Sequence, residues 1–572
     1  MNLLIKIFCL AAILNLSETF QIYADVEKYN VKWEIDGDLI TFSIEAETTG
    51  FVGLGFSRGG GMSGADIVVG GVRNGVPYLE DRHAISRSTP ILDEEQNVEL
   101  IEAFENDTHT FIKFSRKLET CDEEGDVAIT EDTISLIWSF GATDDLVYHG
   151  ANRGSRSVNL LDPQGPENPD LSKYKVWELR TVKAMPAADT TYWCTIHKSP
   201  NVPRKQHIVG FSAILESPSA YVHTHHMEAY LCHVPPGMES VFETYLNHTG
   251  EDCYYPDDPD FPGHFCESIA YGWAIGGEVV LFPDHVGFPL VSGEYFKLEV
   301  HYNNPNHLND VAFDTGLKLY YTEDLRVLDA GRIAIGSEIN FTQMIPPNSE
   351  KFVTVAHCDV SCTAELPENG VALFNFLIHA HLSGKKLKVR QFRNGEELPW
   401  LINDEHYDFN FQATRPFRKE MRLMPGDHLA LECEYDSRWK NGSAIVGGRS
   451  TNEEMCMTFI SYYPRIDGLL TCNSEVNKDK LLNFFQIQEI SLNHPSDTDP
   501  IVELPLEMQG RTFSQVVESV NWTPEVREFY QKVTRFDRHD AYCRPSGVQV
   551  KVGYPPHGED YVPGDVCERR RR

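Results

Sequence analysis

The chain has 572 residues, too many for one hydrophobic core, so two to four domains are expected. Its hydrophobic content of 41% is ordinary, and its 41 Gly and 32 Pro favour many short strands and turns over long helices. The formal net charge of −35 argues against a nucleic-acid partner, whose phosphates would be repelled.

Residues 1–24 are typical of a secretory signal peptide. Lys6 lies within an apolar run from Leu3 to Leu16, and a small-residue cleavage site follows near Ala24. A membrane anchor needs about 20 apolar residues, and this run is shorter. No later stretch is long and apolar enough, so no transmembrane anchor is expected. We therefore predict a protein of the secretory-pathway lumen (endoplasmic reticulum or vesicle) or a secreted one.

Cysteines and glycosylation sequons indicate the same compartment. Of the 13 cysteines, Cys9 lies in the predicted signal peptide, and the remaining even number suits disulfides in an oxidising compartment. Sequons for N-linked glycans occur at Asn106, Asn247, Asn340, Asn441 and Asn521.

Most of the remaining chain has the alternating pattern of β-strands. Residues 25–150 alternate apolar and polar positions between glycine turns, as in an antiparallel β-sandwich. Residues 162–170 contain three prolines and resemble a linker. The strand pattern resumes over residues 175–470, with a break near Asp329-Ala330-Gly331, and a helix is expected to begin at Pro524. We predict an all-β fold with a mixed C-terminal segment.

Two histidine clusters have strand spacing that suits a metal ion. On a strand, His379 and His381 share one face, so both imidazoles can bind one ion. Phe374, Phe376, Ile378 and Ala380 lie on the opposite, core face. His301 likewise shares a face with polar residues. We expect both histidine faces to lie on open surfaces that face each other across a gap.

A third cluster contains the adjacent residues His225 and His226. Neighbouring residues of a regular strand point to opposite faces, so these two can bind one ion only at a bulge or a strand end. Chance gives about one His-His and one His-x-His in a chain of this composition, so spacing alone does not establish a metal site.

A methionine narrows the choice of metal. Imidazole suits Zn, Cu, Fe and Ni, whereas a thioether selects Cu(I). Met455, in Asn452-Glu453-Glu454-Met455-Cys456, is the candidate. Sequence position alone does not bring it to His379.

Several longer motifs resemble the type II, ascorbate-dependent copper monooxygenases, and most closely the dopamine-β-hydroxylase-like monooxygenase proteins. The motifs are Thr190-Thr191-Tyr192-Trp193-Cys194, His225-His226-Met227, Leu298-Glu299-Val300-His301-Tyr302, Leu377-Ile378-His379-Ala380-His381, Phe409-Asn410-Phe411-Gln412, and Glu454-Met455-Cys456 before Tyr462-Tyr463-Pro464. The resemblance implies a DOMON β-sandwich and two tandem β-sandwich copper domains. The expected division is signal peptide 1–24, DOMON domain 25–150, N-terminal copper domain 175–330, C-terminal copper domain 331–480 and C-terminal extension 481–572.

The resemblance also implies cofactors and site residues. Two copper ions are expected per chain, with ascorbate as electron donor and O2 as co-substrate. One ion would be bound by His225, His226 and His301, and the other by His379, His381 and Met455. Tyr192 and His379 are expected to have catalytic roles. The implied reaction converts R–H, O2, two electrons and two protons into R–OH and water.

Family pairing implies six disulfides that use every cysteine outside the signal peptide. They are Cys121–Cys567, Cys194–Cys253, Cys232–Cys266, Cys358–Cys472, Cys362–Cys543 and Cys433–Cys456.

The motifs say less about the substrate than about the metal ligands. Peptide-amidating relatives have an Arg two residues before His-x-His, which anchors a peptide carboxylate, whereas this chain has Leu377. Met457 and Phe459 likewise replace the Asn and Tyr of those relatives. We therefore expect a small, fairly apolar substrate such as a phenethylamine-like compound rather than a peptide.

Other functions stay open at this stage. The chain could be specifically a tyramine or dopamine β-hydroxylase, or a non-catalytic secreted DOMON binding protein. The DOMON domain could bind a sugar, or haem through Met62 and His149. The sequence does not identify the substrate, and it leaves open whether the chain forms a homo-oligomer.

Overall fold

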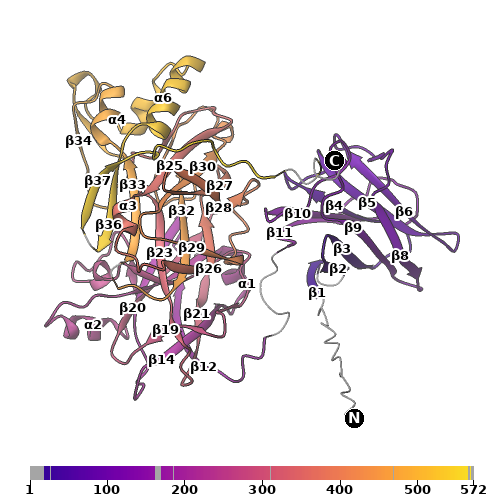
Figure 1. The fold of residues 1–572 in the computed structure, drawn as a ribbon, viewed down its shortest axis with the longest axis horizontal. Helices are drawn as coiled ribbons and strands as arrows, with labels where there is room; N and C mark the ends of the chain where they lie inside the picture. The colour runs from indigo at the N-terminus through magenta and orange to yellow at the C-terminus, as the bar shows by residue number, and fades with distance from the viewer. Residues whose placement is uncertain are drawn as a thin grey trace, which may run out of the picture. The chain divides into compact units, whose positions relative to one another are not determined.

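The computed structural model describes residues 19–25, 28–161, 169–184, 186–309, 311–467, 469–545, 547–564 and 567. Most of the predicted signal peptide, and most of the predicted linker, lie outside these residues. The described residues form two compact units, of which the first contains the chain up to Thr130, the segment beginning at Ile134 and Cys567. The second contains residues 131–133 and the rest of the chain up to Gly564 (Figure 1).

The first unit is a β-sandwich of two antiparallel sheets, as the alternating sequence predicted. One sheet has the order β1 (Thr19–Asp25), β2 (Tyr29–Asp36), β3 (Leu39–Ala46), β9 (Thr110–Lys117), β8 (Val98–Glu105). The other has the order β11 (Arg153–Val158), β10 (Ile134–Phe140), β4 (Val52–Ser57), β5 (Ala65–Arg73), β6 (Val76–Ala84), β7 (Ile91–Leu92). Between them lies a core rich in aromatic rings, including Trp33, Phe42, Phe56 and Phe114. Strand β1 overlaps the predicted signal peptide 1–24 and pairs with β2.

The second unit begins with a sandwich of two sheets. Its outer sheet has the order β12 (Lys175–Ala184), β21 (Ala312–Thr322), β14 (Gln206–Leu215), β19 (Val286–Leu290), β22 (Leu328–Asp329), and β18 (Val280–Leu281) also pairs with β14. Its inner sheet has the order β16 (Glu251–Asp252), β13 (Thr190–Lys198), β20 (Tyr295–Asn303), β15 (Thr224–Leu231), β17 (Ser268–Ala274). Phe296, Leu298 and Val300 of β20 enter the core, which leaves the alternate residues for the other face of the inner sheet.

A second sandwich follows in the same unit. Its seven-stranded sheet has the order β29 (Arg415–Leu423), β26 (Val371–His379), β32 (Met457–Tyr463), β23 (Gly331–Ser337), β33 (Leu469–Val476), β36 (His539–Pro545), β37 (Val548–Val552). The sheet packed on it has the order β25 (Phe352–Cys358), β30 (His428–Tyr435), β27 (Gly384–Arg393), β28 (Glu396–Asp404). Two short pairs join β24 (Met344–Ile345) to β31 (Ile445–Val446), and β34 (Glu489–Ser491) to β35 (Ile501–Leu504).

Helices are few and short. They are α1 (Pro218–His223), α2 (Glu239–Tyr245), α3 (Val360–Thr363), α4 (Lys478–Phe484), α5 (Phe513–Glu518) and α6 (Pro524–Phe536), with 3-10 turns η1 (Pro262–Phe265), η2 (Arg438–Lys440) and η3 (Leu506–Met508). The helix expected at Pro524 is α6, where Thr523 caps the first turn and Pro524 is the first helical residue. None of the helices in the described residues is long and apolar enough to cross a bilayer.

All six expected disulfides are present: Cys121–Cys567, Cys194–Cys253, Cys232–Cys266, Cys358–Cys472, Cys362–Cys543 and Cys433–Cys456. Cys121–Cys567 ties Cys567 to the first unit.

Candidate metal centre

The first histidine group lies on the inner sheet of the first sandwich of the second unit. His226 on β15 is directly opposite His301 on β20. The register of these strands shifts between Thr224 and His226, so His225 is the extra residue of a β-bulge. The bulge resolves the difficulty that adjacent residues of a strand face opposite ways. The sequence required this irregularity for a shared metal ion, and the structure has it.

The three imidazoles of this group converge through their δ nitrogens. The Nδ1 atom of His226 lies 3.2 Å from Nδ1 of His225 and 3.4 Å from Nδ1 of His301. Two nitrogens that bind one ion at about 2.0 Å are about 3.3 Å apart in a tetrahedral site. The spacing therefore fits one shared ion.

The second group lies at the end of β26 on the second sandwich. Gln412 Oε1 lies 2.6 Å from Nδ1 of His379, and the carbonyl oxygen of Glu453 lies 3.0 Å from Nδ1 of His381. Each δ nitrogen is therefore the donor, and each Nε2 has a free lone pair. Both Nε2 atoms are buried and have no hydrogen-bond partner among the described residues. Such orphaned acceptors fit a metal ion, and fixed Nδ1 partners are typical of histidine ligands.

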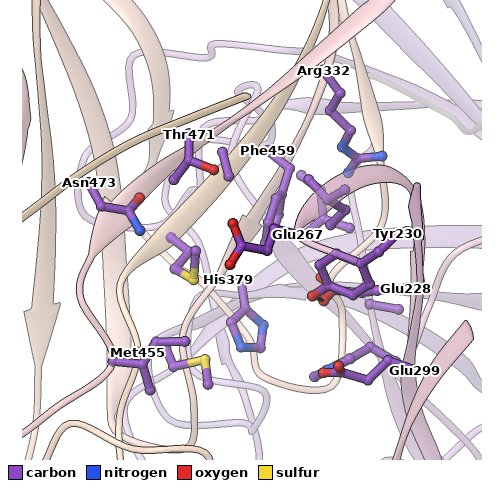
Figure 2. A pocket seen from close by; sticks show the side chains of 18 of the residues that line it. Glu228, Tyr230, Glu267, Glu299, Arg332, His379, Met455, Phe459, Thr471 and Asn473 are labelled. Atoms are coloured by element: carbon purple, nitrogen blue, oxygen red, sulfur yellow. Dashed lines mark hydrogen bonds between the residues drawn. The ribbon is translucent and has the colours of Figure 1, made fainter. Parts of the chain in front are cut away.

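The structure also brings Met455 to this group, which strand spacing could not predict. Figure 2 shows its thioether beside the ring of His379. Two restraints fix the Met455 backbone: the Tyr435 hydroxyl donates to its carbonyl oxygen at 2.8 Å, and the neighbouring Cys456 is bonded to Cys433. Two imidazoles and a thioether form a donor set that suits Cu(I).

Glu454 is a site residue that the sequence analysis missed. Its carboxylate is fully buried and accepts hydrogen bonds from the backbone N–H groups of His381 at 2.7 Å, Ser383 at 2.5 Å and Met455 at 3.3 Å. It thereby ties the segment of His381 to that of Met455. Burial raises the pKa of its carboxyl to about 8. In the sequence, only its position beside Met455, in the motif Glu454-Met455-Cys456, indicated that Glu454 belongs to the site.

The expectation that both histidine faces lie on open surfaces is wrong. The five histidines and Met455 are at most 7% exposed. Each histidine face is too polar to be the core of its own sandwich, but the other sandwich covers it. The ring centroids of His226 and His379, one from each sandwich, are therefore only 5.4 Å apart. Burial lowers the pKa of His225 to about 3 and that of His379 to about 4, so both imidazoles are neutral, as metal binding requires.

Gln412 connects the two groups. Its Oε1 contacts His379, and its amide nitrogen lies 3.3 Å from Nε2 of His225 and donates to the Phe409 carbonyl at 2.8 Å. The Phe409 ring stacks on His225 with centroids 4.1 Å apart. The sequence identified this segment only as part of a motif, without a role.

Tyr192 packs against the first group rather than pointing a free hydroxyl at it. Its ring stacks on His301 with centroids 4.4 Å apart, and its hydroxyl donates to the Arg449 carbonyl at 2.9 Å. Burial raises the pKa of Tyr192 well above its ordinary value, so the phenol stays protonated.

A cavity of about 170 Å³ lies between the two facing sheets, next to His226, His379 and Met455 (Figure 2). The seven-stranded sheet contributes Arg544 of β36 and pairs of alternate residues from four neighbouring strands. Because they alternate, these pairs lie on one face: Leu377 and His379, Met457 and Phe459, Arg332 and Ala334, Thr471 and Asn473. Apolar residues form much of the wall. Pockets for drug-sized ligands are about 300–1,000 Å³, so this cavity suits a smaller molecule.

Carboxylates line the opposite wall. Glu228 accepts a hydrogen bond from the Tyr230 hydroxyl. Glu299, across the strand pair from Glu228, is paired with the Lys297 ammonium at 3.1 Å and accepts from the Tyr254 hydroxyl at 2.9 Å.

In the first unit, neither predicted haem ligand is highly exposed. Met62 is half-buried and packs against the small apolar cluster that contains Phe51, while His149 is half-buried with its ring beside Tyr148. The suggestion of haem binding stays a prediction.

Comparison with known proteins gives three family matches along the chain. Residues 25–141 match the DOMON domain, residues 177–309 match the N-terminal domain of copper type II ascorbate-dependent monooxygenases, and residues 328–485 match the C-terminal domain of the same enzymes.

Full-length relatives agree with these matches. The chain is 37% identical to DBH-like monooxygenase protein 1 of Gallus gallus over 93% of this chain and 87% of the relative. It is 35% identical to the Homo sapiens protein of that name over 87% and 81%, and 29% identical to dopamine beta-hydroxylase of Bos taurus over 86% and 79%. Among solved structures, the cytochrome b domain of pyranose dehydrogenase from Coprinopsis cinerea covers 24% of this chain and 80% of that chain, with 15% identity and a TM-score of 0.22, too low to support an argument.

Proposed function

The chain belongs to the copper type II ascorbate-dependent monooxygenases, and on this premise we propose that it hydroxylates a C–H bond of a small molecule with O2 and ascorbate. Two copper ions per chain would be bound, one by His225, His226 and His301, the other by His379, His381 and Met455. The observation that supports this most strongly is the meeting of these two buried donor groups beside one small cavity.

Bound copper would supply one-electron redox chemistry and the activation of O2. The chain's own residues prepare the site for it. Burial keeps the imidazoles neutral, so their lone pairs are available to an ion. The Gln412 side-chain oxygen and the Glu453 backbone carbonyl accept the δ N–H groups of His379 and His381, which leaves the lone pairs of both ε nitrogens available to an ion. The Met455 thioether favours the reduced ion.

The cavity supports a small-molecule substrate. Its apolar wall holds the hydrocarbon part of a substrate beside His379 and Met455 and excludes water from the reacting carbon.

The disulfides support an oxidising compartment. Six disulfides are rare in the cytosol, so the protein would be in the secretory-pathway lumen or outside the cell. The asparagines of four sequons are exposed: Asn106, Asn247, Asn441 and Asn521. The amide of Asn340 instead donates to Glu475 at 2.8 Å.

Oxygen uptake by the copper-loaded full chain tests the proposal. With ascorbate and a panel of small aromatic molecules, wild type should consume O2 in a substrate-dependent way. Met455→Ala should abolish this uptake yet retain copper in the three-histidine group. Met508→Ala, which removes a thioether from η3, is the matched control and should behave as wild type.

Two results would contradict the proposal. Equal turnover by wild type and Met455→Ala would remove Met455 from the oxygen site. No uptake by a two-copper wild-type preparation across the panel would favour a non-catalytic binding protein.

A further inference from the structure

Arg332 is a buried cation in the wall of the cavity. It lies on β23, is 5% exposed, and shares the cavity-facing side of that strand with Ala334. Figure 2 shows its guanidinium directed toward Tyr230 and Glu228, at the end of the cavity away from Met455. Its Nε is buried without a hydrogen-bond partner among the described residues. Its guanidinium lies over the Phe459 ring, 5.4 Å from Cζ to centroid.

Other buried arginines of the same unit have carboxylate partners. The Arg415 guanidinium is 2.9 Å from Asp404, and that of Arg390 is 2.7 Å from Glu397. Buried charges are normally paired in this way, because removing an ion from water without compensation is costly. Within the described part of the chain, the Arg332 side chain forms neither an ion pair nor a hydrogen bond.

The carboxylates of the cavity do not supply the missing partner. Glu228 attracts Arg332, but one of its oxygens accepts from the Tyr230 hydroxyl, and no ion pair or hydrogen bond joins the guanidinium to Glu228 or Glu267 among the described residues. Glu299 is bound to Lys297. Burial lowers the pKa of Arg332 to about 10 despite the attraction of Glu228, so the side chain stays cationic at neutral pH.

We propose that Arg332 binds a carboxylate of the substrate and thereby sets the substrate class: a small apolar acid or amino acid rather than a simple amine. The planar guanidinium can donate two parallel hydrogen bonds to a carboxylate. With that group at Arg332, the apolar part of the molecule lies along Phe459 and Leu377, and its other end is beside His379 and Met455. This inference rests on the proposed function, since it places the substrate in the same cavity.

Position on the sheet explains why the sequence did not reveal this residue. Leu377, where peptide-amidating relatives have an anchoring Arg, pairs with Phe459 on β32, and Phe459 pairs with Ala334 on β23. Arg332 therefore reaches the cavity from two strands away. The expectation of a phenethylamine-like substrate considered only the positions aligned with the peptide-amidating relatives.

Binding of three matched ligands tests the inference without turnover. Phenylalanine differs from phenethylamine only by a carboxylate, and 3-phenylpropionate differs from phenylalanine only by the amine. Isothermal titration calorimetry on the copper-loaded full chain, without ascorbate, measures each dissociation constant. We expect both carboxylates to bind at least about 30-fold more tightly than phenethylamine, as for a buried charge pair.

Variants identify the residue responsible. Arg332→Gln should bind phenylalanine as weakly as phenethylamine, and Arg332→Lys should retain part of the preference. Arg544→Gln removes an exposed cation from the mouth of the same cavity and should keep the full preference, which separates direct contact from long-range attraction. Copper content and circular dichroism report whether each variant is folded.

Two results would overturn the inference. In the first, wild type does not bind the carboxylates, or binds them no more tightly than phenethylamine. In the second, Arg332→Gln keeps the preference for the carboxylates. If Arg332→Gln does not fold, the Arg332→Lys and wild-type results decide. Failure of the proposed function would be seen separately, as missing copper or missing ascorbate-dependent oxygen uptake alongside intact carboxylate binding.

Discussion

The imidazole rings of His226 and His379, which belong to different histidine groups, lie 5.4 Å apart and nearly perpendicular to each other. Each ring points away from the core of its own sandwich, on a face that the other sandwich covers. The two donor groups therefore form one continuous buried centre, and residues that join them should influence both.

Gln412 is the clearest such residue. Replacing it with Leu removes the acceptor for Nδ1 of His379 and should weaken copper binding at the His379 group by about 10–100-fold, as loss of a ligand's hydrogen-bond partner commonly does. Competition with a copper chelator measures this affinity. Asn410→Leu, on the exposed turn two residues earlier, is the control. Equal affinity in Gln412→Leu and wild type would exclude a role in orienting His379.

Variants of Tyr192 distinguish a ring that positions His301 from a hydroxyl that takes part in catalysis. Tyr192→Phe keeps the ring that stacks on His301 and loses only the hydrogen bond to Arg449, so turnover should fall by less than about tenfold, near 1 kcal/mol. Tyr192→Ala removes the stack and should release copper from the three-histidine group. Loss of hydroxylation in Tyr192→Phe, with both coppers retained, would instead indicate a catalytic hydroxyl.

Glu454 should matter for the stability of the site. Glu454→Ala leaves three buried backbone N–H groups without their acceptor, and each such group costs about 1–3 kcal/mol. We expect a large decrease in melting temperature and loss of copper from the His379 group. The neighbouring Glu453, whose backbone carbonyl rather than side chain contacts His381, provides the comparison. Glu453→Ala should retain more copper than Glu454→Ala, and the reverse order would contradict the assignment.

The free energy of unfolding of the first unit should depend on pH. Burial, with the nearby charges of Asp66 and Asp126, raises the pKa of Asp81 to about 7 against the weaker opposing effect of Arg116. The folded state then keeps a proton that the unfolded state releases above about pH 4. The free energy of unfolding should therefore fall as pH rises from about 4 to 7, by about 1.4 kcal/mol per pH unit for this group.

Calorimetry on Asp81→Asn checks this pH dependence. The variant should show a shallower slope than wild type, because Asp66, whose pKa is raised to about 6, keeps its own contribution, and it should melt at a higher temperature than wild type at pH 8. An unchanged slope would mean that Asp81 is already ionised in the folded protein.

The sequence predicted the strands, the faces on which His301, His379 and His381 lie, and the need for a bulge or a strand end at His225 and His226, because these follow from strand geometry. It could not predict the burial of both faces, which depends on how two sandwiches pack. The approach of Met455 to His379 and the six disulfides came from family resemblance. Arg332 and Glu454 were missed because their importance arises from burial and missing or multiple partners, which residue spacing does not encode.

Copper X-ray absorption on the reduced, copper-loaded protein tests the central claim most directly. We predict that wild type has one sulfur scatterer for every two copper ions, together with imidazole nitrogens, and that the sulfur contribution disappears in Met455→Ala while copper in the three-histidine group remains. A wild-type spectrum with nitrogen and oxygen scatterers alone would contradict the account.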